Sequence, residues 1–257
     1  MSDGTSRSGR REPPPFRRVT LLGRTQVSPH MVEIVLAGPE LAGLVVAEPA
    51  ASVRLLVPGP GHDELVIPKW NGNEFLLEDG TRPVIRTFTP HRYDPQAGEL
   101  RLSIVIHLEG AASTWAGSAP LGAPAAVSGT GRGYTINPEA SAFVLMGDET
   151  AIPAIAQLLE TIPESTEVEV DIEVRAPDAE FPMPYHPGAT VRWHVPGSGG
   201  EPGDTLVAAA RRVEPRPGLH IWCAGEAAAM HLIRGVVFKE KGLSRSQATI
   251  RGYWKKR

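Results

Sequence analysis

The first half of the chain alternates apolar and polar positions over short runs that turn residues separate. From Leu100 to Ile106 every second residue is Leu or Ile, while Arg101, Ser103 and Val105 lie between them. This alternation predicts strands with one buried face and one partly wet face, as in an antiparallel sheet or barrel. The predicted strands are Val19–Val27, Met31–Leu36, Ser52–Val57, Val84–Thr89 and Glu99–His107, interrupted by one short helix, Ser113–Ser118.

After Glu139 the pattern changes to strands that alternate with helices. Ala142–Met146 is wholly apolar, as expected for a strand covered on both faces. A helix is predicted at Thr150–Thr161, where apolar residues recur at helical spacing. Further strands are predicted at Glu167–Val174, Val191–His194 and Leu219–Ala224, and further helices at Asp204–Val213 and Glu226–Lys241. We therefore predict an α+β two-domain protein, an antiparallel β-barrel followed by an α/β half with a mostly parallel sheet.

One strand of the second half is unusually acidic. Glu167, Glu169, Asp171 and Glu173 alternate with Val and Ile. A central parallel strand does not tolerate such a row, so we expect this strand near an edge of the sheet or partly exposed.

Length and charge narrow the class of protein. The 257 residues divide into a disordered basic tail (1–15), the barrel domain (16–138) and the α/β domain (139–257). The net charge of −3 gives no general attraction to nucleic acid or to an anionic membrane. Cys223 is the only cysteine, which excludes an intrachain disulfide and fits a reducing compartment.

The same sequence contains no segment of about 18 or more apolar residues, so no integral membrane segment is expected. Residues 1–18 have no apolar core and are not a secretory signal; a transit peptide is the alternative to a disordered tail. We expect a cytoplasmic protein.

Several catalytic motifs are missing. There is no HExxH motif or EF-hand loop, no GxSxG nucleophile turn and no P-loop, and a protein-bound metal is not expected. The run Gly129–Gly133 resembles part of a dinucleotide fingerprint, but no helix follows it. A barrel loop that needs glycine conformations is the favoured reading.

Three segments carry candidate chemistry. Arg86–Thr89 ends a predicted strand with a guanidinium for phosphate, an aromatic ring and a hydroxyl, which suit a flavin. In His107–Ala116 small residues and Ser113 enter a short helix, whose free N–H groups could bind phosphate. The alternatives are an ordinary strand with one solvated Arg and a plain capped helix with Trp115 in the core.

The third segment, Gly147–Ile155, is a strand-to-helix turn. Pro153 is tolerated only in the first helical turn, so a helix N-terminus lies at the carboxyl end of a strand, where open α/β sheets bind ligands. Asp148 and Glu149 would repel a bare phosphate, so we expect the nicotinamide end or the flavin edge here. The alternative is a conventional N-cap.

Together these segments resemble the siderophore-interacting protein family, flavin-dependent ferric-siderophore reductases related to ferredoxin–NADP reductases. The resemblance extends from about Arg18 to the C-terminus. The runs that carry it are Ser28–Val32, Leu36–Leu41, Arg86–Asp94, His107–Ala116, Gly147–Ile155, Trp222–Glu226 and Arg251–Lys255. Two positions depart from the usual pattern: Phe88 replaces a Tyr, and His91, with Arg92 beside it, stands where Arg is frequent.

The resemblance implies that the barrel holds FAD. Arg86 and the helix start at Ala112–Ser113 would contact its phosphates, with His107 nearby. Phe88 and Thr89 would line the isoalloxazine. The complete set that the resemblance places around FAD is Arg86, Thr87, Phe88, Thr89, His107, Ala112, Ser113, Thr150, Tyr253 and Trp254.

The resemblance also implies the redox partners. Thr150 would approach the flavin from the second domain, and Tyr253–Trp254 would pack near the flavin or its adenine. The electron donor would be NADPH or NADH, or in some members a ferredoxin, and the acceptor a ferric siderophore that releases Fe(II) on reduction. No side chain is expected to act as a catalytic acid or base.

Basic residues are candidates for capturing an anionic siderophore. These are Lys69, Arg132 and Lys255, with Lys256 and Arg257 beside the last. Each could also be an ordinary solvated charge. Arg175, after a strand of the α/β half, could meet a 2′-phosphate and favour NADPH, although acidic neighbours argue against this.

Three other functions remain open at this point. The protein could be a reductase that feeds electrons to free flavin or a partner protein, a non-enzymatic flavin- or siderophore-binding module, or an unrelated barrel and α/β protein without FAD.

Overall fold

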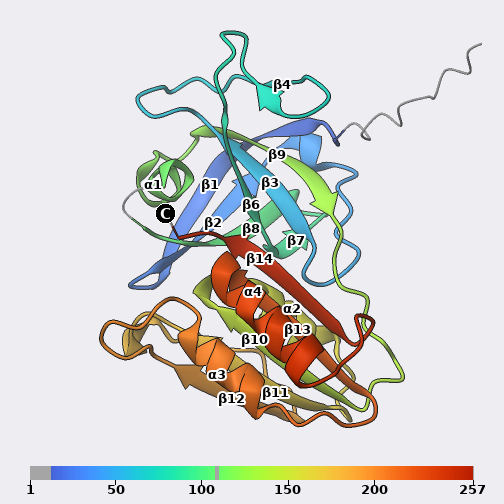
Figure 1. Ribbon diagram of the computed structural model, residues 1–257. Helices are drawn as coiled ribbons and strands as arrows, with labels where there is room; N and C mark the ends of the chain where they lie inside the picture. Colours follow the sequence, from blue (N-terminus) through green and yellow to red (C-terminus); the bar gives the residue numbers. More distant parts are fainter. Residues whose placement is uncertain (1–12, 108–109, 257) are drawn as a thin grey trace, which may run out of the picture.

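The N-terminal half folds into one curled antiparallel sheet. A computed structural model describes residues 13–107 and 110–256, so most of the predicted tail lies outside the described residues. The strand order is β6-β3-β9-β1-β2-β8-β7, so β6 and β7 form the two edges. Only Thr89 separates these edges in the sequence, which requires the sheet to curl round on itself into a barrel (Figure 1). The strands are β1 (Phe16–Ser28), β2 (Met31–Ala37), β3 (Ser52–Val57), β6 (Val84–Phe88), β7 (Pro90–Asp94), β8 (Glu99–Val105) and β9 (Pro124–Gly131).

The predicted strands of the barrel are present, but β7, β9 and a small hairpin were not predicted. β9 pairs with both β1 and β3 and is central to the sheet. A separate hairpin, β4 (Lys69–Trp70) and β5 (Phe75–Leu76), lies outside the barrel. The helix α1 (Ala111–Ser118) begins two residues earlier than predicted and packs beside β6. Apolar side chains of alternate strand positions fill the barrel.

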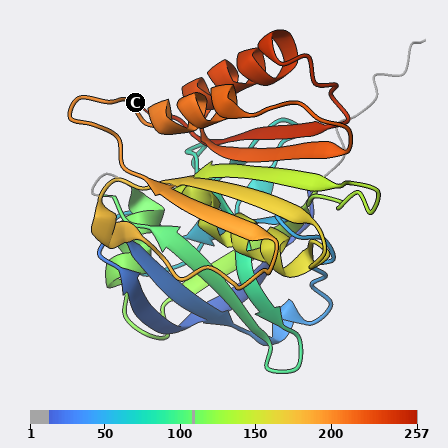
Figure 2. The ribbon, with the colours of Figure 1, turned by 90° about the horizontal axis from the view of Figure 1, so that it is seen from below.

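The C-terminal half contains a five-stranded parallel sheet in the order β12-β11-β10-β13-β14. Helix α2 packs on the face toward the barrel, while α3 and α4 cover the other face (Figure 2). The elements are β10 (Ala142–Asp148), η2 (Glu149–Ala151), α2 (Ile152–Thr161), β11 (Glu167–Glu173), η3 (Pro177–Ala179), β12 (Ala189–His194), α3 (Asp204–Arg212), β13 (Leu219–Glu226), α4 (Ala227–Gly235), η4 (Val236–Glu240) and β14 (Ala248–Trp254). The two-part α+β architecture is as predicted.

The acidic strand β11 lies one position in from the edge strand β12, as expected from its composition. Glu167 at its start is exposed, but Asp171 and Glu173 are buried. Asp171 is paired with Arg192 and His194 of β12, and Glu173 accepts hydrogen bonds from the start of α3. An inner strand therefore carries buried carboxylates because each one has partners.

Two features of the C-terminal half were not predicted. The last strand, β14, completes the sheet beside β13, and the predicted helix Glu226–Lys241 changes from α4 to the π-helical turn η4. Cys223 is buried and is a free thiol. Among the helices that the structure describes, none is long and apolar enough to cross a membrane.

Candidate functional site

The flavin motif, Arg86–Thr89, lies where the two edges of the curled sheet meet, and its last residue contacts the α/β half. Arg86 and Thr87 are exposed on β6, and Phe88 is half-buried against the barrel core. Thr89 is buried, and its Oγ1 lies 3.5 Å from the hydroxyl of Tyr253 on β14. The structure thus brings together two of the predicted site residues that are 164 positions apart in the sequence.

The start of α1 has no side-chain cap among the described residues. Its N-cap position is Gly110. The Ser113 hydroxyl instead holds the preceding loop, because Oγ accepts from His107 N at 2.8 Å and donates to His107 O at 3.0 Å. Ala112 and Ser113 are themselves buried, so the helix offers backbone N–H groups and not these side chains.

These barrel residues fit the phosphates of FAD. An uncapped helix N-terminus carries a partial positive charge, and α1 packs beside β6, which presents the exposed Arg86. Gly110 also leaves room for the His107 ring: a Cβ at this glycine would lie 2.3 Å from His107 Cε1. Leu108 and Glu109 lie outside the described residues.

A buried carboxylate organises the side of the site that the α/β half contributes. Asp148 ends β10 and accepts from Thr150 N (2.9 Å), Thr150 Oγ1 (2.5 Å) and Trp254 Nε1 (2.7 Å). Thr150 and Trp254, both predicted site residues, are therefore anchored on one group. Burial raises the pKa of Asp148, although these hydrogen bonds oppose the shift. The conventional N-cap that we considered for this turn is also present, because Asp148 caps η2.

Tyr253 connects the two parts of the site. Its ring lies edge-on to Trp222, with centroids 6.3 Å apart, and its hydroxyl faces Thr89. Burial raises the pKa of this tyrosine, so it is a neutral hydrogen-bonding group at physiological pH.

Carboxylates also cap the other helices at this edge of the parallel sheet. Glu173 at the end of β11 accepts from Gly203 N and Thr205 N, and Glu226 at the end of β13 accepts from Ala228 N and Ala229 N. The helix starts where α/β sheets bind phosphate are thus occupied by internal anions. That a bare phosphate is repelled near Asp148 stays a prediction.

Arg175 is held by a neighbouring acid. Its Nε lies 3.0 Å from Glu149 Oε2, and its Nη1 donates to Ile106 O of the barrel. Glu149 is buried, so a 2′-phosphate at Arg175 would have to compete with this ion pair.

The basic candidates for substrate binding stand on separate elements. Lys69 lies on the outer hairpin, where it pairs with Glu78 at 3.0 Å, and Arg132 follows β9. Lys255 follows β14 and is exposed, and its neighbour Lys256 pairs with Glu201. No described contact joins Lys69, Arg132 and Lys255, and Arg257 lies outside the described residues.

Two side chains make contacts between the halves that were not anticipated from the sequence. Arg251 donates to Ala50 O, Arg132 O and Gly133 O of the barrel, and Gln157 of α2 bonds to Ala50 and Pro90. Arg251 stood in a run that carried the family resemblance, which was the one available signal. Gln157 is the polar residue on an otherwise apolar stretch of α2, a signal that we did not use.

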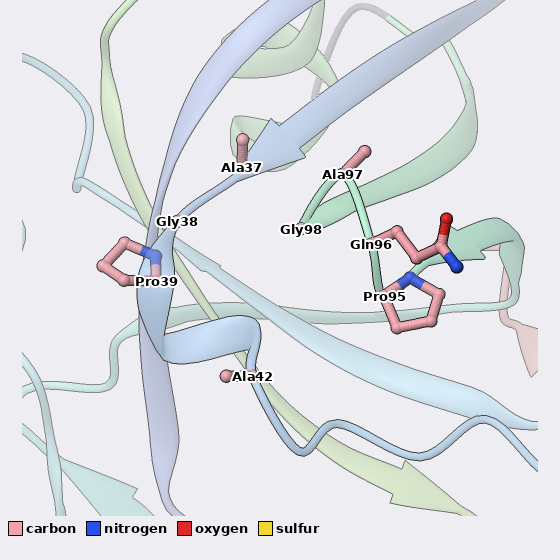
Figure 3. Close-up of a pocket in the computed structure, with 8 residues that line it drawn as sticks. All are labelled: Ala37, Gly38, Pro39, Ala42, Pro95, Gln96, Ala97 and Gly98. Atoms are coloured by element: carbon pink, nitrogen blue, oxygen red, sulfur yellow. The ribbon is translucent and has the colours of Figure 1, made fainter.

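Two surface hollows lie on the barrel. One of about 380 Å³ is lined by residues 37–39, 42 and 95–98, between the end of β2 and the β7–β8 turn (Figure 3). Its lining is mainly small residues, Pro and backbone, with Gln96 as the polar side chain. Another, of about 450 Å³, is lined by charged residues that include Glu33, His91 and Arg101. His91 pairs with Glu33 at 2.9 Å on this outer face. Neither hollow is lined by Arg86–Thr89, although the second is lined by His91 and Arg92, which belong to the same run of the family resemblance.

The described part of the chain contains no group of three or more His, Cys, Asp or Glu side chains arranged to hold a metal ion.

In comparisons with known proteins, each half of the chain matches its own family model. Residues 20–133 match the siderophore-interacting FAD-binding domain, and residues 140–257 match the siderophore-interacting protein family. The crystal structure of a siderophore utilization protein from T. fusca is 32% identical, with a TM-score of 0.83 and coverage of 95% of this chain and 94% of that one.

Two more distant proteins are also similar to this chain. The ferric vibriobactin reductase ViuB of Vibrio cholerae is 24% identical over 93% of this chain and 89% of its own length. A flavohemoglobin from Malassezia yamatoensis, solved with FAD and heme, shares the fold at 16% identity and a TM-score of 0.66, covering 93% of this chain and 60% of that one.

Proposed function

Since this chain belongs to the siderophore-interacting protein family, whose N-terminal domain binds FAD, we propose that it reduces ferric siderophores with electrons from NADPH, NADH or a ferredoxin. The observation that carries the proposal is the seam between the halves. There Thr89 of the flavin motif contacts Tyr253 of β14, and Asp148 binds both Thr150 and Trp254, while α1 packs beside β6 in the barrel.

The barrel residues would bind the cofactor. The Arg86 guanidinium and the N–H groups at the start of α1 would hold the FAD phosphates, while Phe88 and Thr89 would line the isoalloxazine. Because Phe88 has no hydroxyl, it contributes ring contact but no hydrogen bond. Thr87 stays in this proposed set as an exposed neighbour on β6.

The chemistry needs a group that handles one and two electrons. A hydride carries two electrons and each ferric ion accepts one, so one hydride reduces two ferric chelates, a conversion that bound flavin supplies. The side chains orient the partners and need not move a proton. Asp148 binds Thr150 and Trp254, and the Tyr253 hydroxyl faces Thr89. The electron donor and the ferric siderophore would therefore meet side chains that are already positioned around the flavin edge.

The α/β half would present the donor. Asp148, Glu173 and Glu226 occupy its helix starts, which supports approach of the nicotinamide end and disfavours a pyrophosphate at those positions. Lys69, Arg132 and Lys255 remain the proposed siderophore contacts. We further propose a cytoplasmic location and a domain boundary between residues 138 and 139.

The visible spectrum of the purified protein tests the cofactor, and anaerobic addition of NADPH or NADH tests the donor. We expect flavin bands near ~450 nm that one nucleotide bleaches and a ferric siderophore restores. Bands without bleaching would indicate a ferredoxin donor or a binding module, and no bands after added FAD would overturn the proposal. Full recovery only with a protein carrier would instead favour a reductase that feeds a partner.

Arg86→Ala tests the phosphate site. Loss of a charge-assisted hydrogen bond of about 1.5–3 kcal/mol should lower FAD affinity by roughly 10- to 100-fold, measured by fluorescence titration. The control is Arg82→Ala, which removes an exposed arginine that pairs with Glu74. Equal FAD affinity in the two variants would contradict the assignment of Arg86.

A further inference from the structure

Gln157 lies in the middle of α2, and its side chain contacts the barrel. Its side-chain amide binds two separate barrel segments. Nε2 donates to Pro90 O at 2.6 Å, and Oε1 accepts from Ala50 N at 2.9 Å. One amide group thus satisfies an acceptor and a donor that lie 40 residues apart in the sequence.

The first segment is the flavin turn. Pro90 is buried and directly follows Thr89, the last residue of the flavin motif. The ladder between β7 and β8 shifts register between Pro90 and Arg92, so the backbone here is not held by a regular sheet alone. A donor from α2 therefore fixes the Pro90 carbonyl, and with it the position of the Thr89 hydroxyl.

The second segment is strained. Ala50 has φ of 54°, the only positive φ at a non-glycine residue in the described chain, and it is almost completely buried. A left-handed alanine costs about 1–2 kcal/mol and needs surrounding structure to hold it. Both of its backbone groups are held by the α/β half, the N–H by Gln157 and the carbonyl by Arg251.

From this geometry we propose that Gln157 is a positioning residue for the flavin: it transmits the placement of the α/β half to the flavin-binding turn. The inference rests on the proposed function. The amide is short, planar and bonded at both ends, so it fixes the distance between the Ala50 loop and the Thr89–Pro90 turn. Without the donor, the turn is free to shift, and the hydroxyl that would meet the flavin edge shifts with it.

The variant Gln157→Glu separates the two bonds. The new carboxylate still accepts a hydrogen bond from Ala50 N but can no longer donate one to Pro90 O. It places one of its own oxygens against the Pro90 carbonyl oxygen. The matched control is Gln96→Glu, which makes the same charge change at an exposed residue of the β7–β8 turn. The probe is FAD itself, titrated into apoprotein, with the visible spectrum of the bound flavin recorded at saturation.

We expect Gln157→Glu to weaken FAD binding by about tenfold and to shift the bound flavin's absorption bands, while Gln96→Glu matches the wild type. A purely structural role would lower the melting temperature and leave the bound spectrum unchanged, which would overturn the inference. So would wild-type affinity and spectrum in Gln157→Glu. If the wild-type protein itself does not bind FAD, the proposed function fails, and this role fails with it. Gln157→Leu removes both bonds; should it not fold, Gln157→Glu alone decides.

Discussion

Ala50 shows how a single residue can carry the strain of an interface. Its left-handed backbone has no sequence signal, because glycine or asparagine is the usual residue in this conformation. The bonds from Gln157 and Arg251 explain why it persists. Such a conformation is a tertiary effect, which local sequence patterns cannot reveal.

The strain at Ala50 has a measurable consequence. In Ala50→Gly, relief of about 1–2 kcal/mol offsets the added chain entropy and the lost methyl burial, so we expect stability within ~0.5 kcal/mol of the wild type. The matched control is Ala126→Gly in β9, which is equally buried and has no strain to relieve. It should cost about 1–2 kcal/mol in the free energy of unfolding by urea. Equal losses in both variants would contradict the strain at Ala50.

Other site residues could be foreseen individually but not as contacts. Thr89 and Tyr253 were both predicted from motifs, and so were Thr150 and Trp254. That the first pair would meet across the seam, and that Asp148 would anchor the second, required the fold. Ser113 shows the converse: a helix was correctly predicted here, although it begins at Ala111, and the Ser113 hydroxyl binds the His107 backbone.

Among the secondary-structure elements, hydrophobic periodicity predicted strands most reliably where each face of the strand is uniform in polarity. The alternation in β8 and the apolar run of β10 predicted both strands correctly. β14 was missed because its residues are half-buried and mixed in polarity, so neither period stands out. The acidic strand β11 has the strand period, but its partners come from β12 and α3 and are not visible locally.

The pairing of β11 with β12 predicts a pH-dependent stability. Burial opposes the charge of Asp171, but hydrogen bonds from Arg192 and His194 outweigh it and lower the pKa of this carboxyl. Because the unfolded chain binds the proton more readily, the stabilisation is complete above the ordinary aspartate pKa of about 3.9 and is lost as pH falls through the lower folded value.

We therefore expect Asp171→Asn to be less stable than the wild type at pH 7 and the difference to narrow toward pH 3. Urea unfolding of both proteins across this range measures it. A difference that stays constant with pH would show that the charge on Asp171 contributes nothing.

The whole molecule is joined by side chains that reach across the seam. Arg251 of β14 donates to three barrel carbonyls, on Ala50, Arg132 and Gly133. The division into a barrel and an α/β half followed from the change of hydrophobic period. Their mutual placement did not, since it depends on contacts more than 100 residues apart, such as Arg251 with Gly133.

Arg251→Lys tests this coupling. A lysine cannot reach three carbonyls with a planar fork, so we expect a loss of about 1–3 kcal/mol in the free energy of unfolding. Arg82→Lys, at an exposed residue between β5 and β6, should change stability by less than about 0.5 kcal/mol. Urea unfolding of both variants gives the comparison, and similar values would mean that Arg251 does not couple the halves.

Several hydrogen bonds between the two halves join side chains of one half to backbone groups of the other. Gln157, Arg175 and Arg251 are side chains of the α/β half, whereas their partners at Ala50, Pro90, Ile106, Arg132 and Gly133 are backbone groups of the barrel. These hydrogen bonds therefore depend on the course of the barrel backbone and not on which side chains the barrel residues carry. Replacing one of the three side chains of the α/β half removes its bonds directly, whereas a substitution at one of these barrel residues removes them only where it moves the backbone.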